Sequence, residues 1–238
     1  MRTRAAALIC STVLAVLAML ASTASAQAQP PGAAPGAVPP DCSSLQGCYG
    51  FEQIAAFYDE MTVWIGEFSK ATYPDMSAPS YVYVESGTTV PTGCNVVLDS
   101  SAYAYCSLDD SVYVGQDQLW AFYSKQGDAA AAVGIAHEWG HHVQHVLGVA
   151  AAGQNGLIAL ENQADCIAGA WVGYIDGLGR LERDDLNDIN AILKVIGAAE
   201  GPGRVHGTLA ERTAAVQTGL RSGLTGCNSF FPGRPVLA

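Results

Sequence analysis

The chain has 238 residues, a formal net charge of −11 and 50% hydrophobic residues. This length suits one catalytic domain with a sizeable core, and a second independent domain is not expected. The acidic balance argues against a surface that binds nucleic acid or an anionic membrane, although solubility alone also accounts for it.

The first 26 residues have the pattern of a secretory signal peptide. Arg2 and Arg4 precede an apolar run over residues 5–20, and Ala24-Ser25-Ala26 is a small-residue cleavage site. An uncleaved membrane anchor is the alternative, but the apolar run is short for a membrane span. We therefore expect residues 1–26 to direct export, and the protein to be secreted or held in the cell envelope without stable membrane insertion.

Residues 27–40 are rich in Gln, Ala, Pro and Gly and are expected to form a flexible or extended tether. The folded domain is expected over residues 41–238. Six of the seven cysteines lie in that range, and an even number in an exported chain favours disulfides. Short loops make Cys42–Cys48 and Cys94–Cys106 the preferred pairs, which leaves Cys166–Cys227, although six cysteines allow about 15 connectivities.

The first half of the domain combines one helix with β-rich segments. Apolar residues at intervals of three and four predict a core-packing helix over residues 51–71. Strands are predicted over residues 81–84, 96–98 and 111–114, and they are expected to form a small antiparallel sheet. The last strand is a candidate edge strand for pairing with an extended peptide, and burial of its valines in an ordinary core is the alternative.

The second half is predicted to be helical. Asp128 is a plausible N-cap for an Ala-rich helix that Gly148 ends. The expected helices span residues 116–125, 129–147, 156–174, 183–198 and 209–221. These elements predict a mainly helical α+β domain with a small sheet beside the Ala-rich helix.

That helix contains the run His137-Glu138-Trp139-Gly140-His141. Residues four apart share a helix face, so the imidazoles of His137 and His141 can bind one zinc ion. Glu138 is then placed to accept a proton from a water molecule that the ion activates. This HExxH spacing indicates a metalloprotease site with one Zn²⁺.

A catalytic zinc site usually has three protein ligands. The metzincin pattern is excluded because Leu147 occupies the position of its third histidine, and His145 lies too far along the helix. His142 and His145 are instead expected to pack or to form hydrogen bonds. In the following helix, Glu161 and Asp165 share one face, so Glu161 is the expected third ligand and Asp165 the acceptor that orients a ligand histidine. A solvated helix face is the alternative for Glu161.

Four segments occur in order from residue 94 onward, and they read AYCSLDDSVYV, HEWGHHVQ, ENQADCIAG and RVHGTLAER. In this combination the chain resembles the bacterial neutral zinc metallopeptidase family. The resemblance implies a zincin-like domain with His137, His141 and Glu161 as zinc ligands and Glu138 as the catalytic base. The chain departs from the family pattern over residues 101–107 and after residue 208, where the substrate groove and the C-terminal packing are expected.

We therefore expect an exported zinc metallopeptidase that hydrolyses peptide or protein substrates. His206, in a glycine-flanked stretch, is the candidate donor to the oxyanion, and Tyr105 is the reserve. A surface or capping role is the alternative for His206.

Two other functions use the same ligands. One is a zinc-stabilised, non-catalytic binding module of the cell envelope, and the other is a zinc amidase that acts on a non-protein envelope substrate. Glu138 argues against the binding module, because a structural zinc site has no use for a proton acceptor beside the metal ion. Such sites are also usually fully ligated by protein. The amidase uses the same chemistry as a peptidase, so the sequence does not separate these two.

Overall fold

The computed structural model describes residues 44–199, 201 and 203–237. The predicted signal peptide, the predicted tether and Cys42 lie outside these residues. The helices are α1 (Ile54–Thr72), α2 (Gln116–Gln126), α3 (Asp128–Val146), α4 (Gly153–Gly177), α5 (Asp185–Ile196) and α6 (Leu209–Cys227). The strands are β1 (Ser80–Val84), β2 (Thr89–Pro91), β3 (Val97–Asp99), β4 (Tyr103–Cys106) and β5 (Ser111–Gly115). The mainly helical α+β class expected from the sequence is confirmed.

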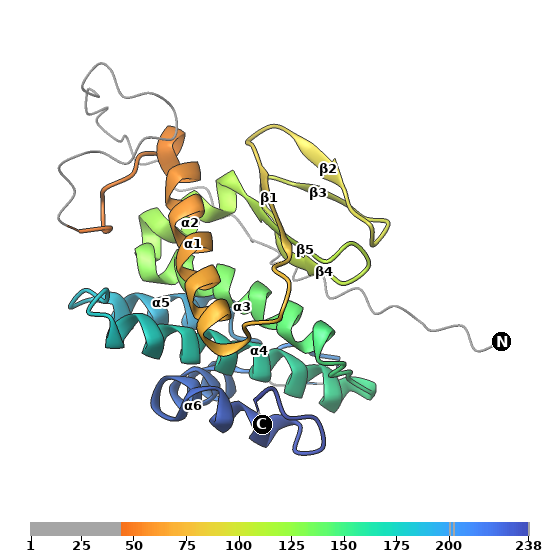
Figure 1. The fold of residues 1–238 in the computed structure, drawn as a ribbon. Coiled ribbons are helices and arrows are strands. Elements are labelled where there is room, and N and C mark those ends of the chain that lie inside the picture. Colours follow the sequence, from red (N-terminus) through yellow and green to blue (C-terminus); the bar gives the residue numbers. More distant parts are fainter. Residues whose placement is uncertain (1–43, 200, 202, 238) are drawn as a thin grey trace.

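Helix α3 lies at the centre of the fold. The strands lie on one side of it and α4 with α6 on the other, as Figure 1 shows. The alanines at positions 129–132 and 136 are buried, and such small side chains let neighbouring helices approach closely. At Gly140, a Cβ atom would lie 3.1 Å from the backbone of Ala164, so α4 packs directly against the HExxH turn. This close approach brings the two helices that carry the predicted ligands together.

The strands form two separate sheets. One has the order β1-β5-β4, and the other is the antiparallel β2-β3 pair. Strand β4, which the sequence did not predict, is antiparallel to β5, but β1 runs parallel to β5, with Ser80 opposite Ser111. The prediction of an antiparallel sheet is therefore wrong for the β1-β5 pair. The intervening chain returns through β2, β3 and β4, so β5 enters the sheet in the same direction as β1.

The edge position considered for the last strand is not observed, and the alternative, burial of Val112 and Val114 in the core, is. Strand β5 is paired on both sides, and all five of its residues are buried. The edges of this sheet are β1 and β4. Any extended peptide that added to the sheet would therefore meet β1 or β4 instead of β5.

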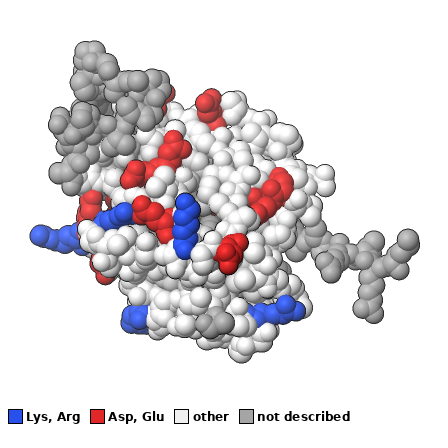
Figure 2. Space-filling model, viewed as in Figure 1, with Lys and Arg blue, Asp and Glu red and all other residues white. Residues whose placement is uncertain are grey.

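Two of the preferred disulfides are present. Cys94–Cys106 joins the β2-β3 region to the end of β4, and Cys166–Cys227 joins α4 to the end of α6. The third pairing includes Cys42, which lies outside the described residues. No helix within those residues has the length and apolar character that a membrane span requires. On the face shown in Figure 2, acidic side chains are spread over the described surface and basic side chains are few.

Candidate active site

Helix α3 places His137, Glu138 and His141 side by side in the interior of the protein. All three are buried, with relative exposures of 6%, 3% and 2%. The imidazole rings of His137 and His141 are 4.8 Å apart between centroids and nearly perpendicular. One helical turn thus directs two ring nitrogens toward the same point.

Glu161 completes this group from α4. Its carboxylate oxygens lie 3.3 Å from Nε2 of His137 and 3.5 Å from Nε2 of His141. One ligand atom from each of the three residues lies within 4.8 Å of the others, as a shared metal ion requires. Nε2 of His141 and Oε2 of Glu161 are buried and make no hydrogen bond with described residues. Buried polar atoms without partners are costly, so their convergence fits a bound divalent cation.

The far nitrogens of both histidines are held by other side chains. Nδ1 of His137 lies 2.8 Å from Oδ1 of Asp165, which also accepts a hydrogen bond from Arg212 of α6 at 2.8 Å. Nδ1 of His141 lies 2.8 Å from Oε1 of Gln144, and the Gln144 amide donates to the Leu160 carbonyl at 2.7 Å. These contacts leave Nε2 of each ring free to bind a metal ion.

The charges of the site influence one another strongly. Burial acts to lower the pKa of His137, but Asp165 and then Glu161 outweigh it and raise this pKa to about 10. Burial acts to raise the pKa of Glu161, but His141 and His137 outweigh it and hold this pKa well below its ordinary value. Burial also raises the pKa of Glu138, and the two histidines offset it only in part. Glu161 is therefore held ionised, as a candidate ligand would be, whereas Glu138 is poised to bind a proton.

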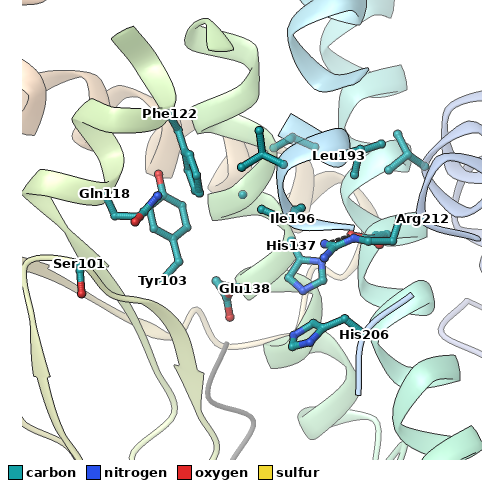
Figure 3. Close-up of a pocket in the computed structure, with 15 residues that line it drawn as sticks. Ser101, Tyr103, Gln118, Phe122, His137, Glu138, Leu193, Ile196, His206 and Arg212 are labelled. Atoms are coloured by element: carbon teal, nitrogen blue, oxygen red, sulfur yellow. Dashed lines mark hydrogen bonds and ion pairs between the residues drawn. The ribbon is translucent and has the colours of Figure 1, made fainter. Parts of the chain in front are cut away.

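A cavity of about 180 Å³ opens beside Glu138. Figure 3 shows Glu138 between Tyr103 on one side and His137 with His206 on the other. Most of the lining is apolar or aromatic. Arg212 lies near the histidines, whereas Ser101 and Gln118 lie on the side of Tyr103 (Figure 3). The lining residues are Ser101, Tyr103, Gln118, Phe122, Val133, Gly134, His137, Glu138, Asp165, Leu193, Val195, Ile196, His206, Arg212 and Val216. This cavity can accept an apolar group next to the candidate metal ligands.

The two candidate oxyanion donors have different positions. His206 lines the cavity, and its Nε2 lies 3.5 Å from Oε2 of Glu161. Tyr105 does not line it, because its hydroxyl donates to Asp110 at 2.7 Å. Tyr103, two residues earlier in β4, lines the cavity in its place. The geometry therefore brings His206 into the site and leaves Tyr105 outside it.

His142 and His145 lie outside the ligand group. Nδ1 of His142 is 2.6 Å from Asp110, and its Nε2 is 2.9 Å from the Ser77 carbonyl. His145 is exposed, with its ring 6.1 Å from that of Tyr105. Both therefore have the packing and hydrogen-bonding surroundings expected of them.

Sequence reasoning did not identify Gln144 and Arg212 as parts of the site. The sequence does contain a signal for Arg212. It shares a helix face with the small or apolar residues Ala215, Val216 and Gly219, and a buried arginine usually has an acidic partner. Gln144 follows His141 by three residues and so shares its helix face. Neither pattern is specific without knowledge of which helices pack together.

Comparisons with known proteins agree with this geometry. A family model described as "Putative neutral zinc metallopeptidase" matches residues 43–230. "Uncharacterized protein YpfJ" of Escherichia coli is 33% identical over 165 residues, which cover 58% of each chain. "Uncharacterized protein Rv2575" of Mycobacterium tuberculosis is 30% identical over 165 residues, which cover 56% of each chain.

The matched segment therefore spans just over half the length of these relatives. No solved structure matches the chain. The family model covers most of the chain and includes all the candidate ligands described above. The protein therefore belongs to the neutral zinc metallopeptidase family.

Proposed function

We propose that the protein is an exported zinc metallopeptidase that hydrolyses peptide bonds with Glu138 as general base. The observation that carries this proposal is the buried group of His137, His141 and Glu161 beside the unpartnered carboxylate oxygen of Glu138. Two imidazoles and one carboxylate are the ligand set of many catalytic zinc sites, which keep a further position for water or substrate. Export rests on the predicted signal peptide and is supported by the two disulfides.

A zinc ion held by these three residues would lower the pKa of a water molecule and polarise the substrate carbonyl. Glu138 then accepts one proton of the attacking water and delivers it to the leaving nitrogen as the C–N bond breaks. Its burial and raised pKa support this role, because a base with a pKa nearer neutrality can also return the proton.

The neighbouring side chains are proposed to keep the ligands in place. Asp165, fixed by Arg212, holds His137 in the tautomer that presents Nε2 to the metal ion. Gln144 does the same for His141. Such orienting contacts typically contribute about 10 to 100-fold to metal affinity.

His206 is proposed to donate a hydrogen bond to the oxyanion that forms at the substrate carbonyl. Burial lowers the pKa of His206, and Arg212 and the two ligand histidines add to this effect against Glu161. A neutral His206 retains one N–H group that can serve as the donor. Its place on the cavity wall beside Glu161 supports this role.

The cavity also suggests a class of substrate. Tyr103, Phe122, Val133, Leu193 and Ile196 form an apolar wall next to Glu138. We therefore propose that a large aliphatic or aromatic side chain beside the scissile bond occupies this space. An apolar pocket typically discriminates side chains by about 10 to 200-fold for each methylene group.

A peptide library tests the function directly. The purified protein is incubated with the library before and after removal of metal by a chelator, and again after zinc is restored. We expect cleavage next to large apolar residues, loss of cleavage with the chelator, and recovery with zinc. Absence of cleavage by zinc-loaded protein that has its full metal content would contradict the peptidase proposal.

A further inference from the structure

A second cluster of acidic side chains lies where α3 and α5 begin. Asp128 is the first residue of α3, and Asp185 and Asp188 lie in the first turn of α5. One carboxylate oxygen from each of these three residues lies within 4.8 Å of the others. Glu182 and Asp184 extend the cluster, since they form a similar group with Asp185.

Asp128 and Asp185 are buried and Asp188 is half-buried, and each has one carboxylate oxygen that makes no hydrogen bond with described residues. Asp128 and Asp185 are 3% and 4% exposed, and Oδ1 of each makes no hydrogen bond with described residues. Oδ2 of Asp188 is also buried without a partner. It lies so close to Gly127 that a Cβ atom there would be 1.8 Å away. The absence of a side chain at Gly127 thus makes room for the third carboxylate.

A small cavity adjoins the cluster. Its volume is about 10 Å³, and Asp128 and Asp185 are both part of its lining. This volume is close to that of one water-sized sphere, which is also the scale of a single cation. Asp188 is not part of this lining, which is otherwise mostly apolar and includes Arg180. The observation that points to a ligand is therefore the pair of Oδ1 atoms on Asp128 and Asp185, which make no hydrogen bond with described residues although both residues are more than nine-tenths buried.

Neighbouring groups do not neutralise the three aspartates. Among the residues that the structure describes, no Lys or Arg forms an ion pair with Asp128, Asp185 or Asp188. Arg180 borders the small cavity, but it pairs with Glu67 at 2.5 Å and lies over the ring of Trp64. The positive end of α3 favours a charged Asp128 and that of α5 favours Asp185 and Asp188, but neither removes the mutual repulsion of the three carboxylates.

The surroundings of the cluster also disfavour ionised carboxylates without a cation. Burial, with Asp185 and Glu182 adding to it, raises the pKa of Asp128 to about 7. Burial and the adjacent acids raise the pKa of Asp188 to about 6. Near neutral pH the cluster must therefore retain protons or bind a positive ion.

We propose that Asp128, Asp185 and Asp188 form a second metal site, which binds Ca²⁺ and is separate from the zinc ligands. The donors are all carboxylate oxygens, which hard cations prefer, and no histidine or cysteine belongs to the group. Calcium accepts irregular arrangements of six to eight oxygens, whereas Mg²⁺ requires a nearly ideal octahedron. Glu182 supplies an additional carboxylate at the edge, although Ser44 and Leu45 already donate hydrogen bonds to it.

Calcium at this place would join the first turn of α3 to the first turn of α5. Asp128 and His137 are nine positions apart on α3, which corresponds to about 13 Å along the helix axis. The ion would therefore not share ligands with zinc. It would instead fix the start of the helix that carries His137 and the helix that supplies Leu193 and Ile196 to the cavity.

Calcium titration of the zinc-loaded full chain tests the proposal. We expect one calcium ion per chain by calorimetry, and a Tm increase of about 5 to 10 °C at about 100 times the dissociation constant. Mg²⁺ at the same concentration should give a much smaller shift. Asp185→Asn and Asp188→Asn should each weaken calcium binding at least about tenfold, because each removes one charged ligand.

Two controls locate the effect. Asp59→Asn changes an exposed acid on α1 and should leave the calcium response unchanged. Glu161→Ala removes a proposed zinc ligand and should also retain calcium binding, which separates the two sites. Absence of calcium binding by the wild-type chain would overturn the proposal, and so would equal binding by Asp185→Asn and Asp188→Asn. If the Asn variants do not fold, equilibrium dialysis of the wild-type chain decides, and fewer than about 0.5 calcium ions per chain at saturation would reject the site.

Discussion

Two clusters of buried acidic groups lie along α3, and their surroundings differ. At the candidate zinc site, His137 and His141 each have their far nitrogen held by another side chain, and the carboxylate of Glu161 faces both imidazoles. At the Asp128 cluster, the facing groups are all carboxylates, and several oxygens have no partner. The first site is preorganised by the protein, whereas the second depends on protons or a cation for its charge balance.

The largest expected effect tests whether the first site is catalytic. Glu138→Gln keeps the shape of the side chain but removes its ability to accept a proton. We expect kcat to fall by about 10² to 10⁴-fold while zinc content, measured by elemental analysis, stays unchanged. Glu85→Gln, at an exposed position, is the matched control and should keep full activity. Undiminished hydrolysis by Glu138→Gln would reject this residue as the base.

The next effect concerns the third ligand. Glu161→Ala leaves two histidines, which bind zinc far less tightly than three protein ligands do. We expect zinc to be lost on dialysis under conditions in which the wild-type chain retains about one ion. If the metal content stays unchanged, the third ligand lies elsewhere, and Asp165 is the next residue to test.

A smaller effect measures how far neighbouring side chains preorganise the first site. Gln144→Ala removes the acceptor at Nδ1 of His141 and should weaken zinc affinity by about 10 to 100-fold. Gln144→Glu restores an acceptor oxygen and should recover much of that affinity. Gln217→Ala, on the exposed face of α6, serves as the control in a competition titration with a chelator. Equal zinc affinities for Gln144→Ala and the wild type would show that His141 needs no orienting partner.

The smallest effect concerns the pH dependence of stability at the second cluster. The pKa of Asp128 rises from 3.8 to about 7 on folding, so the folded chain retains a proton that the unfolded chain releases. The contribution of Asp128 to the free energy of unfolding is therefore fully present below pH 3.8 and is lost as the pH rises through about 7. Relative to the wild type, Asp128→Asn should thus gain stability between these values in calcium-free buffer, as measured by urea unfolding of zinc-loaded protein.

Saturating calcium should reduce this difference, because a bound cation favours the ionised form of Asp128. Asp185 and Asp188 on α5, with Glu182 before it, face the same group, and their negative charges add to burial in raising the pKa of Asp128. Parallel pH curves for the two chains would contradict the raised pKa.

The parts of the site that the sequence predicted are those that depend on helix periodicity. The spacing of His137 and His141, and of Glu161 and Asp165, fixes which side chains share a face of one helix. The meeting of those two faces was inferred from ligand chemistry, and the structure places them together. The contact of Arg212 with Asp165 depends on the docking of α6 and has no comparable local signal.

The sheet shows the same limit. Local composition predicted three of the strands near their observed positions, but it did not reveal β2 and β4. Strand direction and order depend on which distant segments pair, so the parallel β1-β5 contact and the central place of β5 were not readable from local pattern. His206 shows the intermediate case, since its glycine-flanked position suggested an approach to the cleft without giving its contacts.

The position of Arg212 has a consequence for how the protein matures. The HExxH helix and Glu161 leave the ribosome well before α6, yet Asp165 gains its cationic partner only when α6 docks against α4. Cys227, at the end of α6, then joins Cys166, the residue next to Asp165. A nascent chain therefore carries the complete ligand motif before its support exists. We expect a chain that ends before residue 209 to bind zinc more weakly than the full chain in a chelator competition, so that proteolytic competence follows the folding of the last helix.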